Sequence, residues 1–283
     1  MRSQDELWLV STRSIGCVDA EQLAPDDFRV SRWNESECQW IDSSWRELNR
    51  TDSRTKWTTI YVHGNRIEPG EDTYHGREWY RSLVHSDDSL PPLRFIIWSW
   101  PSSQIRGQLK DIRAKYRRSQ YESDYLGWYL LGTPRRPTLL IGFSYGGLIV
   151  PGALQYAADH RDGEDRTPPW SAMLVAAAEP TTWLWPDGRH GRAFEEVQRA
   201  IVLVNPCDPA LKRFGAVDPC NRPSAVGYAG FPESGLPARA QADVSFYNVS
   251  GIVGRIHDEH PYRSSITVGG WITEAARAAL DAR

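Results

Sequence analysis

The sequence contains little that would tie the protein to a membrane or to an oxidising compartment. No stretch of its 283 residues approaches the roughly 18 consecutive apolar residues of a membrane-spanning helix. No apolar run follows the charges at the N-terminus, so we expect no secretory signal. The four cysteines include no Cys-x-x-Cys pair and no histidine at zinc-ligand spacing. These absences favour a cytoplasmic protein with free thiols, and a pairing of Cys207 with Cys220 across a loop stays open.

Features of nucleic-acid, metal and cofactor binding are also missing. The net charge is −3 at pH 7, and the densest basic run, residues 113–118, is typical of a solvated helix face. The sequence has no Gly-x-x-x-x-Gly-Lys loop and no dinucleotide fingerprint. The carboxylates of residues 68–72 have no histidine at a metal-ligand spacing. We therefore expect no nucleic-acid partner, no metal and no cofactor.

Short β-rich segments alternate with helical patterns along the chain. Strands are predicted at 7–12, 28–33, 57–64, 93–100, 138–143, 171–178, 199–205 and 243–251. Helices are predicted at 42–48, 74–84, 108–132, 145–159, 192–200 and 271–282. Several strands are apolar throughout, which indicates an α/β protein with a mostly parallel central sheet and helices on both faces. We expect one domain over residues 1–283, with a long loop at 206–242 bordering the site.

Residues 138–147, Thr-Leu-Leu-Ile-Gly-Phe-Ser-Tyr-Gly-Gly, place a Gly-x-Ser-x-Gly turn directly after a predicted strand. Glycines on both sides of the serine permit a sharp turn into the next helix, which lifts the hydroxyl above the sheet at a helix N-terminus. The alternative is a tight packing turn without chemistry. The strand–turn–helix context favours Ser144 as a nucleophile.

A serine nucleophile needs an oxyanion hole, and a second strand end supplies a candidate. His63-Gly64-Asn65 follows residues 57–62 of the predicted strand, where its apolar run ends. Backbone amides in such a turn can face the charge that develops on a carbonyl oxygen. We expect the amides of Asn65 and Tyr145 to be the two donors, and His63 to be a structural hydrogen-bonding residue.

The nucleophile also needs a histidine base and a carboxylate, in the chain order serine, acid, histidine. Asp208 follows the predicted strand 199–205 and is the favoured acid, with Glu179 and Asp218 as alternatives. Two histidines follow the last predicted strand. His260 is favoured because Pro261 would help to fix it, and His257 is the alternative.

Thirteen tryptophans are many for a chain of this length. Large aromatic side chains mostly fill cores. Two pairs lie near the predicted site segments, and we expect them to form a wall of the substrate pocket: Trp98, Trp100, Trp183 and Trp185.

With these motifs, the chain resembles the α/β-hydrolases, and more narrowly an esterase- or lipase-like family of serine hydrolases of unknown function. The matching pieces cover most of the chain: WLVSTRS, IYVHGN, IIWSWPSS, YESDY, LLIGFSYGG, NPCDPAL and DEHPY. The piece most specific to this family is SWPS at 99–102, because the sequence at that strand end otherwise varies among α/β-hydrolases. The resemblance implies Ser144 as nucleophile, Asp208 as acid and His260 as base. The chain departs from the family in its charged HGNRIEPGEDT loop and in residues 206–242, which leaves the substrate open.

The sequence thus predicts a serine hydrolase that cleaves a carboxylic ester, or a related acyl bond, of a small-molecule substrate through an acyl-enzyme. The same residues would serve a peptidase, a thioesterase or an acyltransferase. A catalytically idle α/β-hydrolase-like binding protein is the alternative outside enzymes. The oligomeric state is open.

Overall fold

The protein is built around a nine-stranded sheet in its computed structural model, which describes residues 1–50, 54–133, 135–161, 168–230 and 243–282. The strands are β1 (Glu6–Ser11), β2 (Arg29–Asn34), β3 (Gln39–Ser43), β4 (Trp57–Val62), β5 (Leu93–Ser99), β6 (Thr138–Phe143), β7 (Trp170–Val175), β8 (Arg199–Val204) and β9 (Asp243–Asn248). Their order across the sheet is β3-β2-β1-β5-β4-β6-β7-β8-β9. Strand β2 runs antiparallel to β1 and β3, and the other neighbouring pairs are parallel.

The register of the sheet brings several strand ends together. Val62 at the end of β4 pairs with Gly142 in β6, and Val175 at the end of β7 pairs with Phe143 on one side and Leu203 on the other. Because these strands are parallel, the segments that follow them leave the sheet at the same edge. In open α/β sheets, ligands bind at this carboxyl edge.

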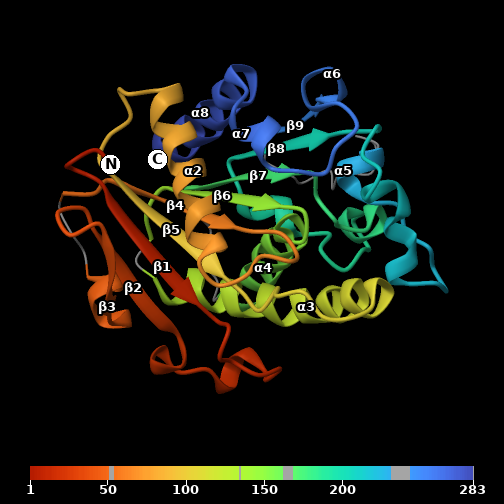
Figure 1. The fold of residues 1–283 in the computed structure, drawn as a ribbon, viewed down its shortest axis with the longest axis horizontal. Coiled ribbons are helices and arrows are strands. Elements are labelled where there is room, and N and C mark those ends of the chain that lie inside the picture. The colour runs from red at the N-terminus through yellow and green to blue at the C-terminus, as the bar shows by residue number, and fades with distance from the viewer. Residues whose placement is uncertain (51–53, 134, 162–167, 231–242, 283) are drawn as a thin grey trace.

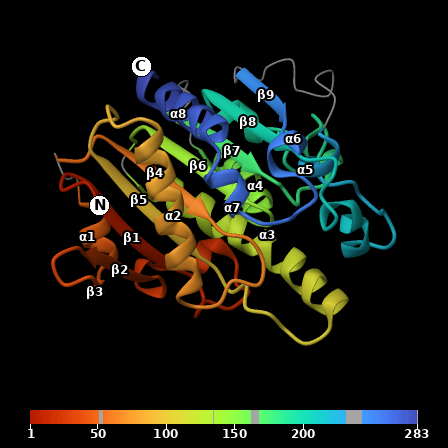
Figure 2. The same cartoon turned by 45° about the horizontal axis from the view of Figure 1, so that its top comes forward.

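Four long helices cover the two faces of the sheet. They are α2 (Glu71–Ser86), α3 (Gln108–Gly132), α4 (Gly146–His160) and α8 (Ile266–Asp281). Helices α3 and α4 pack together on one face, whereas α2 and α8 lie on the other (Figures 1 and 2). The shorter elements are α1 (Trp45–Asn49), α5 (Val226–Ala229), α6 (Ser250–Val253), α7 (His260–Arg263) and the 3-10 turns η1 (Ala20–Gln22), η2 (Pro25–Asp27), η3 (Thr181–Leu184), η4 (Ala193–Glu196) and η5 (Leu211–Val217).

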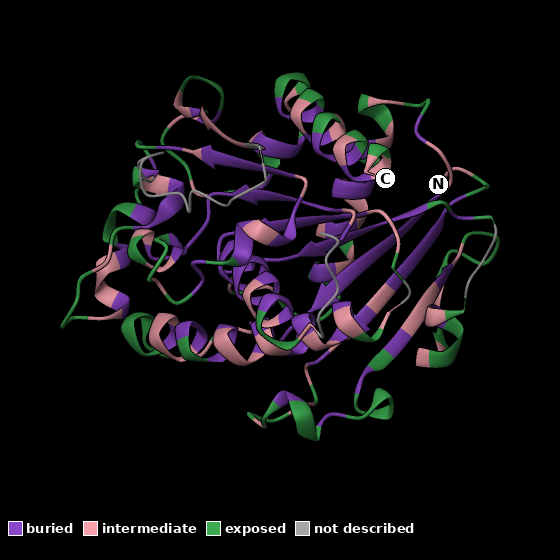
Figure 3. Ribbon diagram, turned by 180° about the vertical axis from the view of Figure 1, so that it is seen from behind, coloured by how far each residue is buried: buried purple, intermediate pink, exposed green. Residues whose placement is uncertain are grey.

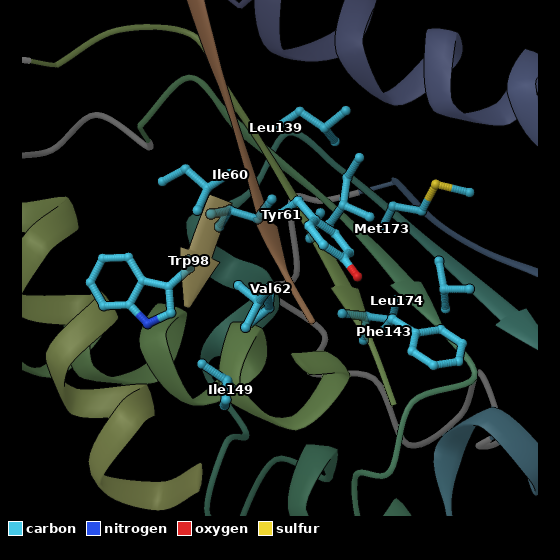
Figure 4. Close-up of a cluster of buried hydrophobic side chains, with 14 of the residues drawn as sticks. Ile60, Tyr61, Val62, Trp98, Leu139, Phe143, Ile149, Met173 and Leu174 are labelled. Atoms are coloured by element: carbon cyan, nitrogen blue, oxygen red, sulfur yellow. The ribbon is translucent and has the colours of Figure 1, made fainter. Parts of the chain in front are cut away.

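Burial explains why the central strands read as continuous apolar runs. Each residue of β4, β5, β6 and β7 is buried, because helices cover both sides of these strands. Figure 3 shows buried residues along the middle of the sheet and exposed residues on the outer helix surfaces. Figure 4 shows part of the core, where Tyr61 and Val62 of β4 lie near Phe143 of β6 and Ile149 of α4. The predicted α/β class with a mostly parallel, doubly covered sheet is confirmed.

Two predicted elements need correction. Residues 42–48 are not one helix, since β3 ends at Ser43 and α1 begins at Trp45, with the Ser44 hydroxyl accepting a hydrogen bond from the Glu47 amide. The predicted helix 192–200 is only the short turn η4 followed by β8. The prediction of one domain over 1–283 stays a prediction, and residues 231–242 of the expected long loop lie outside the described residues.

Two expectations from composition can be compared with the described residues. None of the helices there combines the length and the apolar character that a membrane crossing needs. All four cysteines are free and exposed, so Cys207 and Cys220 do not pair.

Candidate active site

Ser144 lies in a strained turn between β6 and α4. Its φ angle is +53°, in the left-handed region that a serine rarely adopts. The turn is held by β7, because the Ser144 amide donates to the Val175 carbonyl at 3.0 Å and the Ser144 carbonyl accepts from the Ala178 amide at 2.9 Å. The side chain therefore leaves the carboxyl edge of the sheet at the start of a long helix, as the Gly-x-Ser-x-Gly pattern predicts.

The glycines of this turn are required by close packing. A Cβ atom on Gly146 would lie 2.0 Å from the Val62 carbonyl oxygen, and one on Gly142 would lie 2.3 Å from the Gly146 carbonyl oxygen. The first turn of α4 thus sits directly on the end of β4. Only a residue without a side chain permits this approach.

We expect Gly146→Ala to lower the free energy of unfolding by at least about 2–3 kcal/mol, because backbone atoms must move to admit the new methyl group. Gly270→Ala is the matched control: Gly270 lies in α8, and a Cβ atom on it would have no other atom within 4 Å. That substitution should raise stability by about 0.5–1 kcal/mol through helix propensity. Urea unfolding of both variants measures the difference, and similar small effects would contradict this account of the turn.

A histidine lies within hydrogen-bonding distance of Ser144, and an aspartate lies within hydrogen-bonding distance of that histidine. The Ser144 Oγ lies 2.9 Å from Nε2 of His257, and Nδ1 of His257 lies 2.6 Å from Oδ2 of Asp208. Asp208 follows β8, and His257 follows β9 and α6. The residues therefore come from the ends of three strands of the sheet, in the chain order serine, aspartate, histidine.

The histidine that the sequence favours, His260, needs correction. It is the first residue of α7, it is exposed, and within the described residues its imidazole makes no hydrogen bond. Pro261 is the reason, since proline is favoured in the first turn of a helix and so marks the start of α7. The loop that reaches Ser144 is the stretch before this helix, and His257 is the histidine in it.

Asp208 is fully buried and accepts three hydrogen bonds. Its Oδ1 accepts from the amides of Ala210 at 2.9 Å and Leu211 at 3.0 Å, and its Oδ2 accepts from His257. Such donors stabilise the charged carboxylate and hold it toward the imidazole.

The alternative acids lie elsewhere. Glu179 is buried beside His190, with 2.8 Å between its Oε1 and Nδ1 of that histidine, and burial raises the pKa of the Glu179 carboxyl. Asp218 accepts hydrogen bonds from Asn221 and Cys220 in a surface turn. Neither carboxylate contacts His257.

The two predicted oxyanion donors flank Ser144. Gly64, next to Asn65, lies so close to Ser144 that a Cβ on Gly64 would be 3.1 Å from the serine Cβ. Asn65, Ser144 and Tyr145 line the same cavity. Within the described residues, the backbone amides of Asn65 and Tyr145 donate to no other protein group, so they are available to a ligand.

His63 has the structural place that the sequence predicts. It is fully buried, its Nε2 accepts from the Trp100 amide at 3.3 Å, and its Nδ1 donates to the Gly64 carbonyl at 2.9 Å. Burial lowers the pKa of His63 to about 4. The ring therefore stays neutral near neutral pH and both its nitrogens are occupied.

A cavity of about 680 Å³ opens over Ser144. Its apolar side is formed by α3, η5 and the end of β6: Ile112, Phe143, Leu211, Phe214 and Val217. Its polar side comes from the loop after β4, from α2 and from the His257 loop: Asn65, Arg66, Glu71, His75, Asp258 and Glu259. A cavity of this size and mixed lining is typical of a small-molecule site.

The predicted tryptophan wall needs correction, because none of the four tryptophans lines this cavity. Trp98 is fully buried in the core (Figure 4), and Trp100 is fully buried with its indole donating to the His63 carbonyl at 2.8 Å. Trp183 packs against Tyr116 and His190, and Trp185 is exposed.

The described residues contain no group of three or more His, Cys, Asp or Glu side chains placed to hold a metal ion.

The sheet order, together with a serine after β6, an aspartate after β8 and a histidine after β9, decides the fold. The chain has the α/β-hydrolase fold.

No family model and no curated protein matches the sequence. Solved structures match with low identity. The esterase from Pyrobaculum calidifontis is 11% identical, with 89% of this chain and 80% of that chain covered and a TM-score of 0.39. An arylesterase is 14% identical, with 91% and 81% covered and a TM-score of 0.38. A bromoperoxidase from Bacillus anthracis is 12% identical, with 77% and 91% covered and a TM-score of 0.40. These scores indicate a loose overall likeness and leave the activity of this chain to its own residues.

Proposed function

We propose that the protein is a serine hydrolase that cleaves a carboxylic ester, or a related acyl bond, through an acyl-enzyme. One observation carries the proposal: the hydrogen-bonded series from Ser144 Oγ to His257 Nε2 at 2.9 Å and from His257 Nδ1 to Asp208 Oδ2 at 2.6 Å. A nucleophile, a base and a group that orients the base are thus within reach of one another. The cavity over Ser144 and the free amides beside it support the same conclusion.

In the proposed reaction, His257 accepts the Ser144 proton at Nε2 as the serine oxygen attacks the substrate carbonyl carbon. The negative charge on the former carbonyl oxygen is held by the amides of Asn65 and Tyr145. The imidazolium is stabilised by Asp208 and gives its proton to the leaving alcohol. The same imidazole then deprotonates a water molecule whose oxygen attacks the acyl carbon, and it returns that proton to the Ser144 oxygen as the carbon–oxygen bond breaks and the carboxylic acid leaves.

The buried position of the acid suits this chemistry. The Asp208 side chain is shielded from water, whereas the His257 side chain is 21% exposed and lines the cavity. Low local dielectric strengthens the interaction of the carboxylate with the developing imidazolium. The same three residues can cleave oxygen esters, thioesters and amides. Assays with each class of substrate therefore identify the leaving group.

Active-site labelling with a fluorophosphonate tests the proposal. We expect the wild-type protein to be labelled once per chain and Ser144→Ala to remain unlabelled. Ser171→Ala is the control, because Ser171 is a buried serine of β7 whose hydroxyl has no hydrogen-bond partner among the described residues. It should be labelled at the wild-type rate. A folded wild type that is never labelled, and that cleaves none of the matched ester, thioester and amide substrates, would overturn the proposal.

A further inference from the structure

The loop that carries the proposed oxyanion amide of Asn65 is fastened by residues outside the cavity. Ser102 is fully buried and binds this loop at both Arg66 and Ile67. The Ser102 carbonyl accepts from the Arg66 amide at 2.8 Å, and its hydroxyl donates to the Ile67 carbonyl at 3.0 Å. The Ile67 amide also lies 3.3 Å from the Ser102 Oγ. The segment after β5 thus holds the two residues that follow Asn65.

Arg13, which follows β1, joins this segment to the loop. Its guanidinium donates to the Ile67 carbonyl at 2.8 Å, to the Ser99 hydroxyl at 2.8 Å and to the Ser103 hydroxyl at 3.3 Å. One side chain therefore contacts the loop after β4, the last residue of β5 and the segment that follows β5. The Arg13 side chain is 16% exposed, and it does not line the cavity over Ser144.

The guanidinium is itself held in place by a buried carboxylate. Oδ2 of Asp72, near the start of α2, accepts from Arg13 Nε at 3.3 Å and from its NH2 group at 3.2 Å. The same oxygen accepts from the Ser99 hydroxyl. Burial alone would raise the pKa of Asp72, yet the Ser99 hydrogen bond and the positive charge of Arg13 lower it. Asp72 therefore stays ionised and fixes the orientation of Arg13.

Asn65 is also held by a side chain of α3. Its Nδ2 lies 3.2 Å from Oδ2 of Asp111, and the Arg66 Nε donates to the same oxygen at 2.8 Å. The loop is thus held by Asp111 as well as by Arg13 and Ser102. Loss of some of these contacts would leave the Asn65 amide present but less firmly held.

We propose that Arg13 and Ser102 are positioning residues that hold the Asn65 amide toward the oxyanion, an inference that rests on the proposed function. An oxyanion donor is effective because it is already in place when charge develops on the carbonyl oxygen, and displacement on the scale of 1 Å lowers the rate strongly. The N-terminal strand β1 thereby contributes to the reaction without touching the substrate. This also gives a role to the STRS and SWPSS motifs, which the nucleophile, base and acid leave unexplained.

The choice of arginine follows from geometry. Its planar fork presents N–H groups in several fixed directions, which three separate acceptors and Asp72 occupy here. A lysine ammonium keeps the charge and cannot reach all of these acceptors at once. We therefore expect Arg13→Lys to restore part of what Arg13→Ala loses.

The test compares Arg13→Ala, Arg13→Lys and Ser102→Ala with Arg94→Ala. Arg94 is the matched control, a buried arginine on β5 that is 3.0 Å from Glu6 of β1, at the opposite end of the same two strands. Removing one oxyanion donor outright lowers kcat about 10²–10³-fold, so a displaced donor should cost about 10- to 100-fold in kcat with KM within about twofold. Arg94→Ala should lose stability to urea and keep kcat within about twofold.

A thionoester gives a readout specific to the oxyanion hole, because sulfur is a larger atom and a weaker hydrogen-bond acceptor than oxygen. The ratio of kcat/KM for an oxygen ester over its thionoester should fall about tenfold in Arg13→Ala and Ser102→Ala, and stay unchanged in Arg94→Ala. Hydrogen exchange provides a second readout, in which the Arg66 and Ile67 amides should exchange at least about tenfold faster in Arg13→Ala and at the wild-type rate in Arg94→Ala.

The outcomes separate this inference from the proposed function. If the wild type hydrolyses esters while Arg13→Ala and Ser102→Ala keep both kcat and the oxygen-to-sulfur ratio, the positioning role is overturned and the function stands. If the wild type neither hydrolyses esters nor labels at Ser144, the proposed function and the role in catalysis fall together. Unchanged exchange at Arg66 and Ile67 would further show that Arg13 does not hold the loop at all.

Discussion

His257→Ala should lower kcat/KM for an activated ester by up to about 10⁶-fold, because removal of the base of a serine protease lowers kcat by about that factor. The Ser144 proton then has no acceptor, because Nε2 of His257 is the imidazole nitrogen at 2.9 Å from Oγ. His260→Ala should keep kcat/KM within about twofold, because surface substitutions that break no contact have small effects. His260 is the first residue of α7, only three positions after His257 in the preceding loop, which makes it a stringent control.

The comparison is made with p-nitrophenyl acetate at pH 7–8, alongside urea unfolding of both variants. Because His257 is partly exposed, its loss should cost little stability, so the activity difference reports chemistry. A large loss in His260→Ala together with near-full activity in His257→Ala would reverse the assignment.

The fold is predicted well where helices bury both faces of a strand. The segments 108–132 and 138–143 match α3 and β6 in their bounds, and 57–64 contains β4. Long apolar or periodic runs carry this information locally. Strand β3 at the edge of the sheet is missed, since its residues are mostly exposed and show no apolar run. Its pairing with β2 depends on a hairpin contact that composition does not reveal.

The site is predicted at the level of strand ends and not of individual loop residues. Gly142 and Gly146 make the Ser144 turn recognisable, because close packing demands glycine at both positions. Choosing between His257 and His260 requires knowing where α7 begins. Pro261 is the signal for that boundary, since it belongs to the first turn of the helix. With the boundary placed there, the sequence would favour the histidine that precedes the helix.

The tryptophans show where a prediction from sequence proximity is wrong. Sequence proximity to SWPS suggests a pocket wall, yet Trp98 and Trp100 point into the protein, where one packs in the core and the other holds the His63 carbonyl. Alternation along β5 cannot distinguish the faces, because helices cover both. The apolar side of the cavity instead combines Ile112 of α3 and Phe143 of β6 with η5, which lies within the segment 206–242 expected to border the site.

Asp208→Asn should lower kcat by about 10⁴-fold while the cavity and KM change little. The amide that replaces Oδ2 can present an N–H to Nδ1 of His257, which favours the tautomer with its proton on Nε2 and so removes the acceptor for the Ser144 proton. It also removes the charge that stabilises the imidazolium.

Glu179→Gln is the control: Glu179 is equally buried after the neighbouring strand, but its partner is His190. That variant should change stability and keep kcat within about threefold, since it leaves the Ser144–His257–Asp208 contacts intact. The pH profile of kcat/KM separates the two roles, because only Asp208 faces the imidazole that must be neutral to act as base. A kcat loss in Glu179→Gln that equals the loss in Asp208→Asn would place the acid after β7 instead of β8.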